Sequence, residues 1–150
     1  MSLTLKIILF ITIALWVLGI FIEFIIPYFN GLSYAYPFIS QLYSTVCHQQ
    51  VSKLIEYNNH HSLVCARCSG IYIGGLFSSF ILLFIPVLKI KDGKFILLAA
   101  LPMLIDVLLY SLGFYSYSKT IALITGLLFG LVGIVYIYYG LQNLLEKNAK

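Results

Sequence analysis

Residues 7–26 read IILFITIALWVLGIFIEFII, a run of twenty residues in which Glu23 is the one charged side chain. A helix of about 20 mainly apolar residues is long enough to cross the hydrocarbon core of a bilayer. Three further runs of this kind follow, at residues 70–88, 95–114 and 121–141. The sequence therefore predicts an all-α protein, a four-helix transmembrane bundle.

The composition supports the same class. Hydrophobic residues make up 61% of the chain and charged residues 9%, whereas a soluble domain carries about 25% charged residues. The four runs occupy most of the 150 residues, so we expect a single integral membrane domain spanning residues 1–150. The first run is longer than a signal peptide core and has no small-x-small cleavage site, so we expect it to be retained as a span.

Orientation follows from the basic residues, which are enriched in cytoplasmic loops. One side of the predicted bundle carries six of them and the other three. The six are Lys6, Lys89, Lys91, Lys94, Lys147 and Lys150, and the three are Lys53, Arg67 and Lys119. This difference predicts a multi-pass protein of the cell membrane with both termini cytoplasmic and the first loop extracytoplasmic. The sequence has no basic patch of the kind that binds nucleic acid, so the expected partner is the lipid bilayer.

The long connection between the first two runs, residues 27–69, is rich in aromatic residues that favour the headgroup region. Apolar and polar residues alternate at near-helical spacing over residues 38–57. We expect one or two short interfacial helices there, with Asn58, Asn59 and His60 as a break before Cys65.

All three cysteines of the chain fall in this connection or at its end. Cys47 is followed by His48, and two residues separate Cys65 from Cys68, a spacer that lets both sulfurs turn toward one point. We therefore predict a metal site made by Cys47, His48, Cys65 and Cys68. Three thiolates and one imidazole suit zinc, and they would also accept Cu(I). His60 or His61 could replace His48 as the fourth ligand.

Two other interpretations of the cysteines remain open. Free cysteine is a common small apolar residue in protein interiors, so the three could simply pack in the core. Alternatively, Cys65 and Cys68 could form a redox pair, because a helix N-terminus and the neighbouring Arg67 both favour the thiolate. In outline this resembles four-helix quinone-linked thiol oxidoreductases such as vitamin K epoxide reductase. Those enzymes add a second cysteine pair, whereas this chain has one further cysteine.

Ionisable residues inside apolar runs are costly and are default functional candidates. Asp106 and Glu23 both lie in the outer halves of their predicted spans, and Arg67 lies at the same mouth. These three are the candidate catalytic residues, and we expect them to line a polar intramembrane cavity beneath the metal site. No pattern in the sequence indicates a further organic cofactor. Two pairs of glycines, Gly70 with Gly74 and Gly126 with Gly130, have the small-x-x-x-small spacing of helix-packing contacts.

Four blocks of the sequence resemble the small prokaryotic membrane family called domain of unknown function 2085. They are CHQ at residues 47–49, CARCSGIYIG at 65–74, LPMLID at 101–106 and TGLLFG at 125–130. The resemblance covers about the last two thirds of the chain and implies no established activity. The chain departs from the family pattern at Val107, Tyr110 and Ala122, where the pattern has glycine, glutamine and arginine. If those polar positions line a pocket in relatives, this member has altered it.

The leading hypothesis is thus a membrane protein with a zinc site above a polar cavity that serves a small or lipid-like ligand. The alternatives are a membrane thiol-disulfide oxidoreductase and a structural or accessory subunit. The sequence leaves open whether the protein is an enzyme, as well as its substrate and its oligomeric state.

Overall fold

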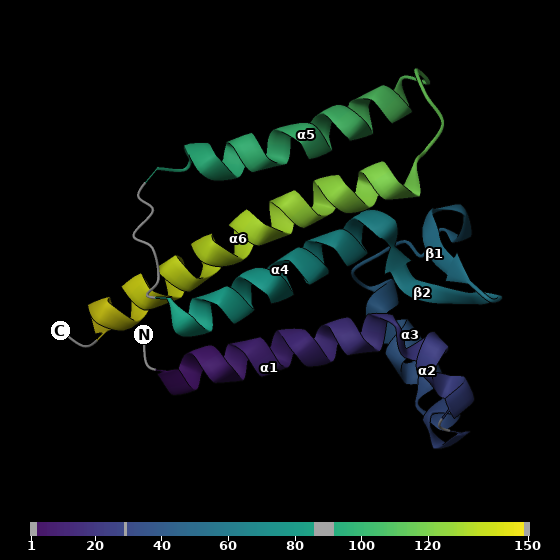
Figure 1. Ribbon diagram of the computed structural model, residues 1–150, viewed down its shortest axis with the longest axis horizontal. Helices are drawn as coiled ribbons and strands as arrows, with labels where there is room; N and C mark the ends of the chain where they lie inside the picture. Colours follow the sequence, from purple (N-terminus) through teal and green to yellow (C-terminus); the bar gives the residue numbers. More distant parts are fainter. Residues whose placement is uncertain (1–2, 29, 86–91, 149–150) are drawn as a thin grey trace.

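Four long helices dominate the computed structural model, which describes residues 3–28, 30–85 and 92–148. They are α1 (Leu3–Ile20), α4 (Ala66–Phe84), α5 (Lys94–Ser111) and α6 (Lys119–Asn148). Each is long and apolar enough to cross a membrane, which confirms the predicted all-α class with four candidate spans. In space they lie in the order α1, α4, α6, α5, each packed mainly on its neighbours (Figure 1). The start of α1 and the end of α6 lie at the same end of the helices (Figure 1).

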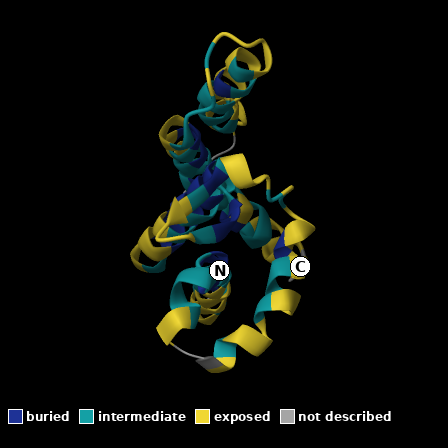
Figure 2. Ribbon diagram, turned by 90° about the vertical axis from the view of Figure 1, so that its right-hand side faces the viewer, coloured by how far each residue is buried: buried dark blue, intermediate teal, exposed yellow. Residues whose placement is uncertain are grey.

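The apolar faces of these helices are largely exposed, as expected for a lipid-facing surface. Leu97 and Leu98 on α5 are 70% and 67% exposed, and Leu15 on α1 is 63% exposed. Buried residues gather along the middle of the row, whereas α5 lies at one edge (Figure 2). Soluble monomers rarely expose so much contiguous apolar surface, so these helices imply a bilayer environment.

The helix boundaries differ from the expected runs. Phe21 leaves helical geometry at ψ 18°, so α1 ends at Ile20 and a separate turn, α2 (Ile22–Ile25), follows. Glu23 therefore lies beyond the first long helix, not inside it. The helix α4 begins four residues before the expected start, and residues 86–88 of that run lie outside the described part of the chain. The helix α5 continues through Pro102.

The closest helix pair is α4 with α6, and glycines permit it. A Cβ at Gly70 would clash with the carbonyl of Leu123, and one at Gly126 would clash with the carbonyl of Arg67. Gly74 and Gly130 face the neighbouring helix backbone in the same way. The predicted packing role of these glycines is confirmed, because the two backbones approach so closely that no side chain fits between them. Both helices run in the same direction, so their N-termini lie at the same end.

Lys6 joins α1 to α4 at the C-terminal end of α4, opposite the end where α4 and α6 begin. Its ammonium donates to the carbonyls of Leu82 at 2.6 Å and Ile85 at 2.9 Å, and its side chain is buried. These carbonyls belong to the last turn of α4, where a helix lacks its own donors and a cation is favoured. Lys6 therefore satisfies the C-terminal end of α4 from α1.

The connection between α1 and α4 was only partly anticipated. It contains the expected short helix, α3 (Tyr36–Ser44), and three 3₁₀ turns, η1 (Ile26–Tyr28), η2 (Asn30–Tyr34) and η3 (Val51–Lys53). Where a second helix or a loop was expected, the chain forms an antiparallel hairpin of β1 (Leu54–Tyr57) and β2 (His60–Cys65). Asn58 and Asn59 adopt left-handed conformations, φ 49° and 62°, which asparagine tolerates and a tight hairpin turn requires. We call this side of the molecule the hairpin end.

The hairpin packs on a small core that joins it to the helices. Val64 and Ile20 are fully buried, and Tyr43 of α3 is 2% exposed. The Tyr43 hydroxyl donates to the carbonyl of Trp16 and sits against Gly19, with burial raising the pKa of Tyr43 to about 12. This core fixes the position of the segment that carries Cys47.

Candidate metal centre

Three thiols meet at the hairpin end. The Sγ atoms of Cys47, Cys65 and Cys68 all lie within 4.8 Å of one another. Cys47 follows α3, Cys65 ends β2 and caps α4, and Cys68 lies in the first turn of α4. The hairpin reverses the chain so that residues eighteen positions apart become neighbours. The structure thus brings together the three predicted thiol ligands.

The surroundings of the Cys65 sulfur favour its thiolate form. The backbone N–H of Cys65 donates to the Sγ of Cys47 at 3.2 Å. A hydrogen bond from the Cys68 thiol lowers the pKa of the Cys65 thiol, and the backbone N–H groups of Cys68 and Arg67 act in the same direction against the opposing effect of burial. These donors belong to the N-terminus of α4, the positive end of the helix dipole. Donors aimed at sulfur are what both a metal site and a reactive thiol need.

None of the three histidines contributes a ring nitrogen to the thiol group in the part of the chain that the structure describes. His48 is exposed beside Cys47. His60 lies 3.8 Å from Glu23, and His61 is paired with Glu56 across the hairpin. The fourth ligand, predicted as His48, stays a prediction.

A second polar group joins α4 to α5. Arg67 forms an ion pair with Oδ2 of Asp106, and the hydroxyl of Tyr115 donates to Oδ1 of the same carboxylate. The Asp106 side chain is 3% exposed and that of Arg67 20%. Both carboxylate oxygens therefore have a donor, which meets the requirement for a buried charge.

Glu23 belongs to neither group. Its carboxylate accepts a hydrogen bond of 3.1 Å from Tyr36 and faces His60, so it ties α2 to α3 and the hairpin. Its carboxylate also raises the pKa of Tyr36, after the larger effect of burial. The three candidate catalytic residues thus separate into an Arg67–Asp106 pair and an independent Glu23 contact.

Tyr117 lies between the thiols and the Arg67–Asp106 pair. Burial raises its pKa to about 12, and the charges of Cys65, Arg67 and Asp106 all act on it. Arg67 also lies over its ring, 5.9 Å from the centroid. Tyr117 was not among the residues expected from the sequence, because a tyrosine near the end of a predicted span ordinarily marks only the bilayer interface.

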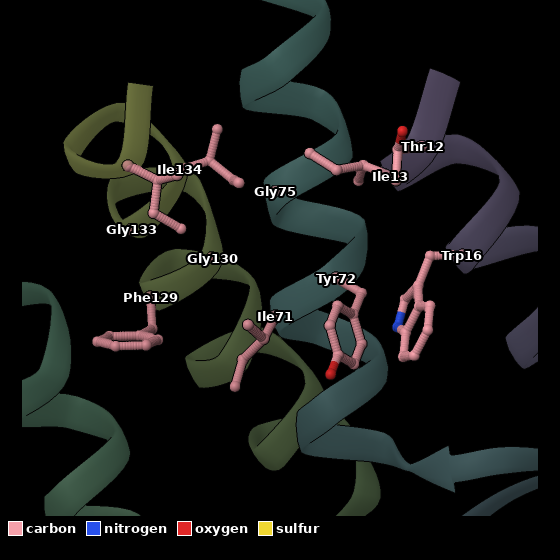
Figure 3. A pocket seen from close by; sticks show the side chains of 11 residues that line it. Thr12, Ile13, Trp16, Ile71, Tyr72, Gly75, Phe129, Gly130, Gly133 and Ile134 are labelled. Atoms are coloured by element: carbon pink, nitrogen blue, oxygen red, sulfur yellow. The ribbon is translucent and has the colours of Figure 1, made fainter. Parts of the chain in front are cut away.

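A cavity with an almost wholly apolar lining lies apart from these charges. It has a volume of about 350 Å³ and lies between α1, α4 and α6 (Figure 3). Trp16 and Tyr72 face each other at one side of it, and Ile71 and Ile134 are among its other lining residues. Asp106 does not line it. Around Asp106 the described side chains form a packed ion pair with Arg67, and the polar cavity expected beneath the metal site stays a prediction.

The comparisons with known proteins agree with the membrane character of the fold. A family described as predicted membrane protein (DUF2085) matches residues 47–136, the region that holds the three thiols and the Arg67–Asp106 pair. An uncharacterised protein of Methanocaldococcus jannaschii is 31% identical over 150 residues, which is 95% of this chain and 96% of the relative. An uncharacterised protein of Methanothermobacter thermautotrophicus is 28% identical over 102 residues, 67% of this chain and 90% of the relative. No solved structure matches.

Proposed function

Because the chain belongs to the DUF2085 family of predicted membrane proteins, we propose that it is a multi-pass membrane protein that holds one zinc ion at its hairpin end. The ligands are Cys47, Cys65 and Cys68, with His48 as the fourth. The observation that carries the proposal is the convergence of the three sulfurs to within 4.8 Å. The excess of lysine on the opposite side supports an extracytoplasmic position for this end.

The thiol group fits a tetrahedral zinc ion. Zn–S bonds of about 2.3 Å in a tetrahedral site place the sulfurs about 3.8 Å apart. The distances between the three sulfurs therefore need to shorten by no more than about 1 Å. The N–H of Cys65 that donates to the Cys47 sulfur is the kind of outer contact that orients a metal ligand. Ser69, fully buried one turn after Cys65, has a hydroxyl without a partner among the described residues. It lies at i+4 from Cys65 and so has a helical position from which it can donate to a metal-bound sulfur.

The fourth ligand decides the chemistry of the site. With His48 bound, the ion is closed off and acts as a structural link between the hairpin and α4. With water or a ligand in that position, zinc would act as a Lewis acid on a small or lipid-like molecule that reaches the hairpin end. Arg67, on the same helix turn as Cys68, and its partner Asp106 on α5 then supply fixed charges near the site.

Metal analysis of the full chain purified in detergent tests the proposal. We expect about one zinc per chain, thiols that become reactive only after chelation, and Co²⁺ spectra with thiolate-to-metal bands. Cys47→Ser, Cys65→Ser and Cys68→Ser should each lose the metal. His48→Ala, compared with His60→Ala and His61→Ala, identifies the fourth ligand as the variant that changes the Co²⁺ spectrum. Metal-free protein with three freely reactive thiols would contradict the zinc site.

A second candidate is favoured by the lowered pKa of Cys65 beside the Cys68 thiol. In this alternative the protein is a membrane thiol-disulfide oxidoreductase that uses a quinone. Cys65 and Cys68 lose two protons and two electrons as one S–S bond forms, and the quinone takes up both to become quinol. Mass spectrometry would detect a Cys65–Cys68 disulfide that quinone forms and a dithiol reductant removes. A third outcome is that the metal is present and that neither Asp106→Ala nor Arg67→Ala alters any measurable ligand binding. That outcome would support a structural or accessory role.

A further inference from the structure

Two cations share one aromatic ring at the hairpin end. The Nζ of Lys53 lies 5.5 Å from the centroid of Tyr117 and 4.9 Å from that of Tyr110, and the Cζ of Arg67 lies 5.9 Å from that of Tyr117. The two tyrosine rings contact each other edge to face at 5.6 Å. We call Lys53, Arg67, Tyr110 and Tyr117 the Tyr117 cluster. Its members come from η3, α4, α5 and the link before α6.

The charges of the Tyr117 cluster do not balance. Asp106 is the carboxylate in contact with it, and Arg67 and Tyr115 already occupy both of its oxygens. Within residues 3–28, 30–85 and 92–148, Lys53 has no carboxylate within ion-pair distance. Ring faces attract a cation but do not neutralise it. Among these side chains, Lys53 and Arg67 carry two positive charges against the one negative charge of Asp106.

Two donors of the same cluster lack acceptors. The Nε of Arg67 and the hydroxyl of Tyr117 are shielded from solvent, and neither has a hydrogen-bond partner among the described residues. The raised pKa of Tyr117 keeps this hydroxyl protonated, so it can donate. Buried donors are almost always paired in folded proteins. An acceptor that also carries negative charge would satisfy both donors and offset the excess charge of Lys53.

The two closely packed helices strengthen this preference. The helices α4 and α6 run in the same direction, and both N-termini lie at the hairpin end (Figure 1). Each N-terminus carries a partial positive charge. The Tyr117 cluster lies beside them, since Arg67 is in the first turn of α4 and Tyr117 is two residues before the start of α6.

We propose that the Tyr117 cluster binds a phosphate group. A phosphate has several acceptor oxygens and a full negative charge, which matches an ammonium, a guanidinium edge and a phenol better than a neutral polar group would. The cluster lies at the end of the apolar helices, so the phosphate belongs either to an anionic lipid headgroup or to a free phosphate ester. The inference goes beyond the zinc site and does not depend on it, because none of the three cysteines belongs to the Tyr117 cluster.

Native mass spectrometry and calorimetry of the full chain in neutral detergent provide the test, with phosphatidylglycerol as one probe and inorganic phosphate as the other. Lys53→Gln removes the unpaired charge, and Tyr117→Phe removes the unpaired hydroxyl but keeps the ring. Lys119→Gln is the matched control, since this lysine lies at the same end but outside the cluster. We expect a roughly 10-fold loss of affinity for Lys53→Gln, a smaller loss for Tyr117→Phe, and less than about twofold change for Lys119→Gln.

Each outcome is decisive. Tight binding of phosphatidylglycerol with weak binding of inorganic phosphate supports a lipid headgroup, and the reverse supports a free phosphate ester. Equal losses for Lys53→Gln and Lys119→Gln, or no binding of either probe, would overturn the proposal. Zinc content and thermal stability are measured on the same samples. Should Lys53→Gln fail to fold, Tyr117→Phe still decides, because it leaves all charges in place.

Discussion

The Arg67–Asp106 ion pair offers the clearest energetic test of the structure. Asp106→Asn keeps the size of the side chain and an acceptor for Tyr115 but removes the negative charge. The remaining guanidinium is then unpaired in a side chain that is only 20% exposed. Breaking a buried pair by removing one partner costs about 3–5 kcal/mol. Because Arg67 keeps partial access to the headgroup region, we expect the lower value, about 3 kcal/mol, or roughly a 100-fold change in the folded-to-unfolded ratio.

A double-mutant cycle separates the pair from its surroundings. Arg67→Gln and the double variant Arg67→Gln with Asp106→Asn complete the cycle, with unfolding measured by denaturant titration in detergent. The double variant should be more stable than the sum of the single losses predicts, by about 2 kcal/mol. Asp92→Asn makes the same chemical change at an exposed site and should leave stability within about 0.5 kcal/mol of the parent. Additive single losses, within about 0.5 kcal/mol, would refute the buried pair.

Three further predictions concern packing, capping and protonation. Gly126→Ala should lower the free energy of unfolding by about 1–3 kcal/mol, because the added Cβ meets the carbonyl of Arg67. The control Gly140→Ala has open space around its Cβ and should not lower that free energy. Equal melting temperatures for the two variants would contradict this prediction. Lys6→Met should lower the free energy of unfolding by about 2 kcal/mol and speed amide hydrogen exchange in the last turn of α4, since two charge-assisted hydrogen bonds are lost. Unchanged exchange would argue against a stabilising contact of Lys6 with the end of α4. Because the pKa of Cys65 is lowered, it is a thiolate at pH values between that lowered pKa and the ordinary thiol pKa of about 8.5. Zinc binding at pH 7 should therefore release fewer than three protons in calorimetry across buffers, and a release of three would show that the shift is absent.

The helices and their glycine contacts could be predicted from the sequence because both depend on local composition. Apolar runs of about 20 residues identify the spans without reference to any partner. The spacing of Gly70 with Gly74 and of Gly126 with Gly130 indicates close packing, although it does not say that the two pairs face each other. The helix ends were less predictable, because Phe21 and Ile22 are as apolar as the residues before them and no breaker marks the bend.

The hairpin could not be predicted from alternation alone. The short segment that includes Leu54 and Ile55 is compatible with either a helix or a strand. The one local signal is Asn58–Asn59, two residues that tolerate the left-handed conformation, and the same pair also fits a simple break between segments. The strands form because Leu63 and Val64 of the hairpin pack with Tyr43 of α3, a contact that depends on tertiary structure.

The candidate site shows the same division. The three cysteines could be selected from sequence because their spacing carries chemical meaning. Lys53 and Tyr117 carry no such spacing signal, and they meet only because η3 and the link before α6 are brought to the same end of the molecule. The grouping of Glu23 with His60 depends on the bend after Ile20, which apolar composition does not reveal.

The contact between Lys6 and the far end of α4 also bears on how the chain is assembled. The acceptor carbonyls lie 76 and 79 residues later in the chain, so Lys6 emerges from the ribosome long before they exist. Until they arrive, its ammonium must remain at the membrane surface, because an unpaired cation is excluded from the hydrocarbon. Insertion of α4 would then draw α1 into its final depth, which makes the second long helix the template on which the first one docks.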